Sequence, residues 1–119
     1  MQNILILATE LNELVNPSFL LKLAGNQVTP VTEADEALNF LLTREKVGQP
    51  FDCLLLVGDW HVSVLTAFLD DLTTNGLNLS VYFASKAPLS SDVQTTLKKA
   101  FKGLRCILNQ TLLEEVHGL

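Results

Sequence analysis

Mostly apolar runs alternate along the chain with stretches of helical periodicity. The runs have the length of strands and occupy residues 3–8, 27–31, 51–57, 79–85 and 104–108. The stretches between them place apolar residues at i, i+3, i+4 and i+7, which is typical of one face of a helix. Because most of the runs lack the alternation of a half-exposed strand, they predict strands with both faces covered, as in a parallel sheet between helices.

Start and stop signals mark the first two helices. Asn16 and Pro17 predict the N-cap and the first position of the first helix, which Gly25 ends. Thr32 predicts the cap of the second helix, with Asp35 placed three residues later as in a capping box.

The second half of the chain repeats the alternation. The stripe of a third helix consists of Leu65, Phe68, Leu69 and Leu72. Pro88 and Ser90 open a fourth helix, which Gly103 closes, and residues 111–116 begin a short fifth helix. The sequence therefore predicts five consecutive strand and helix units.

Five such units predict a doubly wound, five-stranded parallel sheet with right-handed crossovers and helices on both faces. Pro30 lies inside the second strand and cannot donate a ladder hydrogen bond, so this strand belongs at an edge. The strand order 2-1-3-4-5 meets this requirement and puts the third strand in the middle. We therefore expect a flavodoxin-like α/β three-layer sandwich formed by residues 1–119 as one domain.

Composition limits the classes of function. The chain is 48% apolar and 18% charged, which supports one packed core, and its formal charge of -5 disfavours nucleic acid or an anionic membrane surface as a partner. No basic segment opens a signal peptide, and no apolar run approaches the roughly 18 residues that span a bilayer. We expect a cytoplasmic protein.

The two cysteines indicate neither a metal site nor redox chemistry. Cys53 and Cys106 lie in separate strand runs without a CxxC motif. The predicted order places the fourth strand between them, which separates them by about 10 Å. A disulfide needs Cα atoms closer than about 7 Å, so we expect two buried, free thiols.

The chain resembles the receiver domains of response regulators, the CheY-like family, over nearly its whole length. Residues 20–41, "LLKLAGNQVTPVTEADEALNFL", resemble the family's first helix, second strand and second helix, and residues 50–57, "PFDCLLLV", resemble its third strand. The resemblance implies the same fold and a place in two-component signal transduction.

Receivers carry a phosphoryl group on an aspartate after the third strand, beside two acidic residues that hold Mg²⁺. The resemblance places the acidic positions on Ala8 and Thr9, which leaves Glu10 as the only carboxylate there. The lysine that pairs with the phosphate falls on Asn109. The hydroxyl position after the fourth strand is Ala84 or Ser85, depending on register.

The position of the phosphoacceptor has two alternatives. Alignment on Asp52 gives Val57, and alignment on the Asp-Trp pair gives Asp59. We favour Val57, because the Asp59 register makes Gly58 the last strand residue and leaves Asp52 unmatched. In either register a single glutamate provides too few oxygen ligands for the divalent ion that an aspartyl phosphate needs.

These substitutions favour a degenerate receiver, or pseudo-receiver. It would carry no catalytic residue, metal or cofactor and would act through protein-protein interaction, alone or as a part of a longer signalling protein. Its partner would be a protein or an output domain. The alternative is an atypical response regulator that is phosphorylated on Asp59 and binds Mg²⁺ through Glu10.

Charged residues of the fourth helix, fifth strand and fifth helix are the predicted interaction surface. The sequence leaves three interpretations of these charges open: an ordinary solvated face, a docking patch for an acidic partner, or a homodimer with paired charges. The residues are Lys98, Lys99, Lys102, Arg105, Glu114 and Glu115.

A small-ligand pocket at the strand ends is a third hypothesis. Nucleotides and FMN would need a glycine-rich turn after the first strand, and "ATELNEL" has no glycine. His61 lies beside Asp59, but the sequence places no nucleophile with them, so we interpret it as a loop histidine.

Overall fold

The computed structural model describes residues 2–108 and Leu112 and contains one five-stranded parallel sheet of order β2-β1-β3-β4-β5. This order confirms the predicted fold class. The strands are β1 (Asn3–Ala8), β2 (Gln27–Val31), β3 (Cys53–Val57), β4 (Ser80–Ser85) and β5 (Leu104–Leu108).

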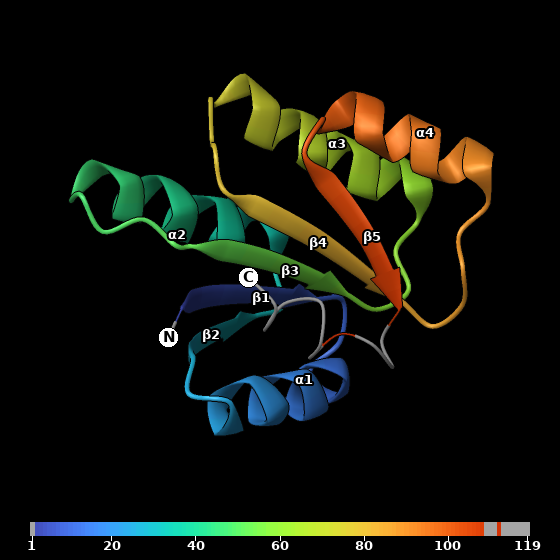
Figure 1. Ribbon diagram of the computed structural model, residues 1–119. Coiled ribbons are helices and arrows are strands. Elements are labelled where there is room, and N and C mark those ends of the chain that lie inside the picture. The colour runs from blue at the N-terminus through green and yellow to red at the C-terminus, as the bar shows by residue number, and fades with distance from the viewer. Residues whose placement is uncertain (1, 109–111, 113–119) are drawn as a thin grey trace.

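Helices cover both faces of the sheet. In Figure 1, α2 (Ala34–Lys46), α3 (Val62–Thr74) and α4 (Ser91–Ala100) lie on one face, and α1 (Asn12–Leu23) lies on the other. The predicted fifth helix lies outside the described residues, apart from Leu112.

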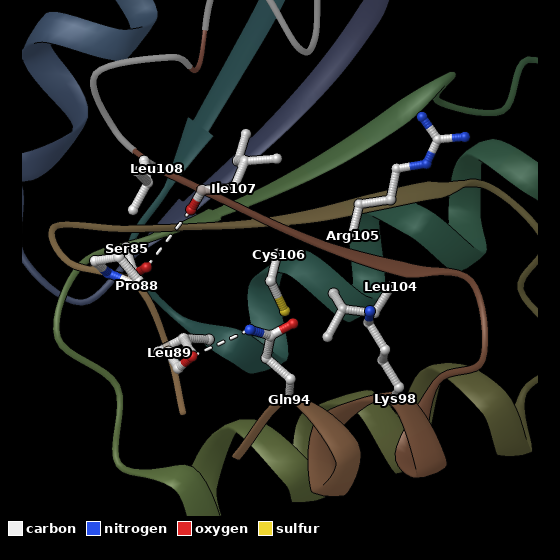
Figure 2. Close-up of a pocket in the computed structure, with 10 residues that line it drawn as sticks. All are labelled: Ser85, Pro88, Leu89, Gln94, Lys98, Leu104, Arg105, Cys106, Ile107 and Leu108. Atoms are coloured by element: carbon white, nitrogen blue, oxygen red, sulfur yellow. Dashed lines mark hydrogen bonds between the residues drawn. The ribbon is translucent and has the colours of Figure 1, made fainter. Parts of the chain in front are cut away.

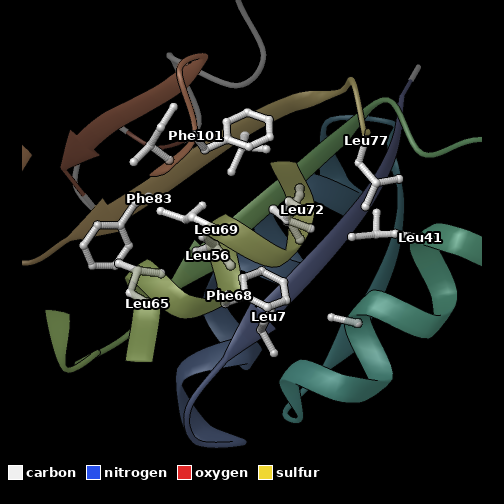
Figure 3. Close-up of a cluster of buried hydrophobic side chains, with 14 of the residues drawn as sticks. Leu7, Leu41, Leu56, Leu65, Phe68, Leu69, Leu72, Leu77, Phe83 and Phe101 are labelled. Carbon is white, nitrogen blue, oxygen red and sulfur yellow. The ribbon is translucent and has the colours of Figure 1, made fainter. Parts of the chain in front are cut away.

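Two hydrophobic clusters, one on each face of the sheet, explain the unbroken apolar runs. Alternate residues of the central strand point to opposite faces, so Leu54 and Leu56 join α2, α3 and α4, whereas Cys53, Leu55 and Val57 join α1. Figure 3 shows the cluster of the first face, where α3 packs against the sheet. All five residues of β3 are buried, as expected for the middle strand.

The edge position of β2 is confirmed. Pro30 pairs with Ile6 of β1, and no strand follows β2 on its other side in the described part of the chain. A missing N–H is harmless there because the outer edge needs no ladder donor.

The predicted start of the first helix is wrong. The helix begins at Asn12, its N-cap is Leu11, and Pro17 lies inside it. An interior proline loses one backbone hydrogen bond. The earlier start buries Leu14, which is 3% exposed, and such burial stabilises by about 1.5 to 3 kcal/mol. Tertiary packing thus outweighs the preference of proline for the first position.

The predicted capping box of the second helix is also wrong. The N-cap is Glu33, so Thr32 lies one residue too early, and no side-chain cap hydrogen bond forms. The first turn instead contains Asp35 and Glu36, whose charges are favourable near the positive end of the helix dipole.

Two other boundary signals are correct, whereas α4 ends at Ala100, three residues before the predicted stop at Gly103. Gly25 follows α1 with φ of +93°, and its amide donates to the carbonyl of Lys22. Ser90 is the N-cap of α4, and its hydroxyl accepts a hydrogen bond from the amide of Val93 at 3.3 Å.

The cysteines are free, as predicted. Cys53 is completely buried in β3, and β4 lies between the strands of the two cysteines. Cys106 is only half-buried in β5, so the expected burial holds for Cys53 alone. Burial, together with the charge of Asp52, raises the pKa of the Cys53 thiol to about 12 from 9.0. Burial also raises the pKa of Cys106, although Lys98 opposes the shift.

This pKa predicts a loss of stability at alkaline pH. In the unfolded chain the Cys53 thiol ionises near its ordinary pKa of 9.0, whereas in the folded protein it stays protonated. The contribution of this thiol to the free energy of unfolding is therefore complete below pH 9 and is lost as the pH rises toward 12. The decline in free energy of unfolding, measured by urea titration, should be shallower in Cys53→Ala. Identical alkaline slopes for the variant and the wild type would contradict the burial of this thiol.

Candidate functional site

Three apolar side chains form a row across the carboxyl ends of the central strands. Ala8 pairs with Val57, and Val57 pairs with Ala84. Their exposed fractions are 0%, 4% and 0%, and all three belong to the cluster on the α1 face of the sheet. We call Ala8, Val57 and Ala84 the apolar row. It lies where α/β sheets of this topology usually carry their site.

The segment after β3 turns Asp59 away from this row. Gly58 has φ of +104°, a conformation that favours glycine, and Asp59 is exposed. The indole Nε1 of Trp60 donates to the carbonyl of Val57 at 2.9 Å, and its ring stacks on Phe68 at a centroid distance of 6.4 Å. These contacts fix the turn with the Asp59 side chain toward solvent.

Glu13 occupies the position beside this turn, which the sequence interpretation missed. Its Oε1 accepts a hydrogen bond from Thr9 Oγ1 at 2.7 Å, and its carboxylate packs directly against Gly58. Thr9 lies in the loop before α1 and Glu13 in the first turn of the helix, so no helical spacing in the sequence indicated this contact. The first helix was also predicted to start after Glu13.

The remaining carboxylates near the strand ends do not gather into a metal cage. Within residues 2–108 and Leu112, no three His, Cys, Asp or Glu side chains are grouped so that they could hold a metal ion. Glu10 is exposed, as is His61, which serves as the N-cap residue of α3. Asn109 lies outside the described residues.

The hydroxyl of Ser85 is engaged within its own loop. It donates to the carbonyl of Ala87 at 2.7 Å, while Ala84, the alternative position, points into the buried cluster. Ser85 is half-buried at the end of β4.

A groove of about 490 Å³ runs between α4 and β5, and we call it the α4 groove. Figure 2 shows Gln94 and Lys98 of α4 on one side and Cys106 of β5 on the other, whereas the Arg105 side chain extends away from α4. The Gln94 amide donates to the carbonyl of Leu89 at 3.1 Å, which ties the helix to the loop before it.

Lys98 is the basic side chain that α4 contributes to this groove. Lys98, Lys99, Lys102 and Arg105 are all exposed. The Arg105 guanidinium, however, lies over the ring of Tyr82, which belongs to the cluster on the α1 face, so the four charges do not form one patch around the groove. Glu114 and Glu115, the acidic part of the predicted surface, lie outside the described residues. Among the helices that the structure describes, none has the length and apolar character to cross a membrane.

Comparison with known proteins identifies the fold. No protein-family model matches the sequence, and no curated protein matches it. Among solved structures, the chemotaxis protein CheY4 of Vibrio cholerae has a TM-score of 0.78 at 16% identity, covering 99% of this chain and 98% of its own. A putative pilus assembly-related protein from Burkholderia pseudomallei has a TM-score of 0.76 at 20% identity, with coverage of 99% and 87%.

A third similar structure contains ligands. The receiver domain of the histidine kinase CKI1 from Arabidopsis thaliana, complexed with Mg²⁺ and BeF₃⁻, has a TM-score of 0.69 at 14% identity, with coverage of 99% and 91%. These likenesses show that the chain has the fold of a CheY-like receiver domain.

Proposed function

We propose that this chain is a receiver-like signalling module that is not phosphorylated and acts by binding another protein. The observation that carries the proposal is the apolar row, Ala8, Val57 and Ala84, at the end of the sheet where receivers hold their phosphoryl group. A methyl or isopropyl group can neither accept a phosphoryl group nor coordinate Mg²⁺.

The electrostatics of the row also disfavour a phosphoryl group. Each of its side chains is at most 4% exposed, so a charge among them would lose its hydration. Asp59, the alternative acceptor, lies two residues beyond β3 and is exposed, and in the described part of the chain no group of three His, Cys, Asp or Glu side chains is placed to hold Mg²⁺ beside it. Such a module would not be an enzyme.

The α4 groove supports the binding half of the proposal. It combines apolar lining with Lys98 of α4, on a chain with a net charge of -5. A local basic surface on an acidic protein attracts an acidic segment and orients it during association. The partner would be an acidic surface of a cytoplasmic protein, or of an output domain joined to this one.

Treatment with acetyl phosphate and Mg²⁺ tests the first half of the proposal. We expect the intact mass to stay unchanged, because the phosphoacceptor position is Val57. An active receiver with known phosphorylation serves as the positive control.

The Asp59→Asn variant separates the two acceptor registers. A mass increase of one phosphoryl group in the wild type that disappears in Asp59→Asn would overturn the proposal and establish Asp59 as the acceptor. A wild type without any mass increase would remove that alternative.

A further inference from the structure

Helix α1 exposes a row of large apolar side chains to solvent. Leu11, Val15, Phe19 and Leu23 follow one another at intervals of four residues, and we call them the α1 ridge. Their exposed fractions are 72%, 61%, 60% and 69%, and Leu20 beside them is 43% exposed.

This ridge is distinct from the face of α1 that packs on the sheet. The buried residues of the helix are Leu14, Ser18 and Leu21. A surface helix usually carries polar residues on its outer face, so α1 is apolar on two sides. A contiguous apolar patch of this kind marks an interaction surface.

We propose that the α1 ridge binds the same ridge of a second copy, forming a two-fold symmetric dimer. Side chains four residues apart form the ridges that interlock when two helices cross at about -50°. A two-fold axis between Val15 and Phe19 sets the ridges antiparallel. Val15 then contacts the partner subunit's Phe19, and Leu11 approaches the partner subunit's Leu23.

The volumes and charges of the ridge favour a second copy as its occupant. The antiparallel arrangement pairs the small Val15 with the large Phe19 at the centre. Glu10, just before the helix, and Lys22, in its last turn, are both exposed, so in this arrangement each approaches its opposite charge on the partner subunit. The two-fold axis repeats this pair of charges.

The apolar area indicates a weak dimer. Burial of a large apolar side chain removes roughly 60 to 120 Å² from water, so the partly exposed ridge and Leu20 supply roughly 300 Å² per copy. With a polar rim the interface reaches roughly 1,000 Å² in total, below the standard size of stable complexes. We expect a dissociation constant on the order of 10 µM.

The dimer leaves the α4 groove accessible. Helix α1 and helix α4 lie on opposite faces of the sheet (Figure 1), so self-association through α1 and partner binding at α4 can fail independently.

Sedimentation velocity of the 119-residue chain, between about 1 µM and about 1 mM, tests the dimer. The weight-average mass of the wild type should rise from 13.1 kDa toward twice that value. The Phe19→Glu variant should remain at the mass of one chain over the whole range. Circular dichroism checks that the Phe19→Glu variant folds. We expect it to fold because Phe19 is 60% exposed and contributes little to the core.

Matched variants identify the surface. Val15→Lys should abolish association, whereas Val64→Lys, at a 52% exposed position of α3, should associate as the wild type does. The double variant Lys98→Glu, Lys102→Glu should also associate normally, because it alters only the α4 surface. Lys22→Glu should weaken the dimer, and adding Glu10→Lys should restore it.

Three results would overturn the proposal. The first is a wild type that stays at 13.1 kDa at every concentration. The second is undiminished association in folded Phe19→Glu and Val15→Lys. The third is association that is lost in Lys98→Glu, Lys102→Glu instead, which would place the contact at α4.

Discussion

The Val57→Asp variant should lose on the order of 3 to 5 kcal/mol of its free energy of unfolding at neutral pH. Val57 is 4% exposed and lies between Ala8 and Ala84, so the introduced carboxylate would be buried beside methyl groups. Burial raises the pKa of such a carboxyl, and the loss should therefore be smaller near pH 4 than near pH 7. Urea titrations at both pH values measure it.

Asp59→Val is the matched control. It makes the reverse exchange two residues away at an exposed position, where substitutions usually change stability by about 0.5 kcal/mol or less. If Val57→Asp lost less than about 1 kcal/mol at neutral pH, the end of β3 would tolerate a carboxylate as a receiver site does.

The Gly58→Ala variant should lose about 2 kcal/mol or more, for two separable reasons. Its φ of +104° is unfavourable for any residue with a side chain, which costs about 1 to 3 kcal/mol. A Cβ at this position would also lie 2.5 Å from Glu13 Oε1, so the carboxylate would have to move. The loss of its hydrogen bond with Thr9 would follow.

Gly25→Ala isolates the backbone contribution. Gly25 has φ of +93°, and a Cβ there would meet no atom within 4 Å. Gly58→Ala should therefore be the more destabilising of the two in thermal and urea unfolding. The Glu13→Ala background should reduce this difference, and an unchanged difference would contradict the contact between Glu13 and Gly58.

The sheet could be predicted from the sequence because its signals are strong and redundant. Five apolar runs set the number of strands, and Pro30 selected the strand order by requiring an edge, in agreement with a central third strand. The position of Cys53 and Cys106 on strands separated by β4 followed from that order. A prediction that depends on many residues, such as the number of strands, stays correct even when single residues depart from the pattern.

The helix starts were less predictable because single residues determine them. Asn16 and Pro17 form a convincing start signal, yet burial of Leu14 extends α1 backward beyond them. Thr32 has the right type for a cap but lies one residue before Glu33, the N-cap. Local preferences of about 1 kcal/mol are easily outweighed by packing.

Because the start of α1 was predicted wrongly, one contact of the site and one surface row could not be predicted. Glu13 was interpreted as part of a loop, so its contacts with Thr9 and Gly58 could not be anticipated. Leu11 and Val15 likewise fell outside the predicted helix, and their common row with Phe19 became visible only in the structure. The positions of Ala8 and Val57, by contrast, depended on strand ends, and those were assigned to the correct residues.

Binding of Mg²⁺ and BeF₃⁻, the ligands present in the CKI1 receiver domain, is the most direct test of an apolar, non-phosphorylatable site. Amide spectra of the ¹⁵N-labelled chain should be unchanged when both are added together, including the amides of Gly58, Asp59 and Ser85. Saturable shifts at these amides that require both Mg²⁺ and BeF₃⁻, and that vanish in Asp59→Asn, would contradict the account.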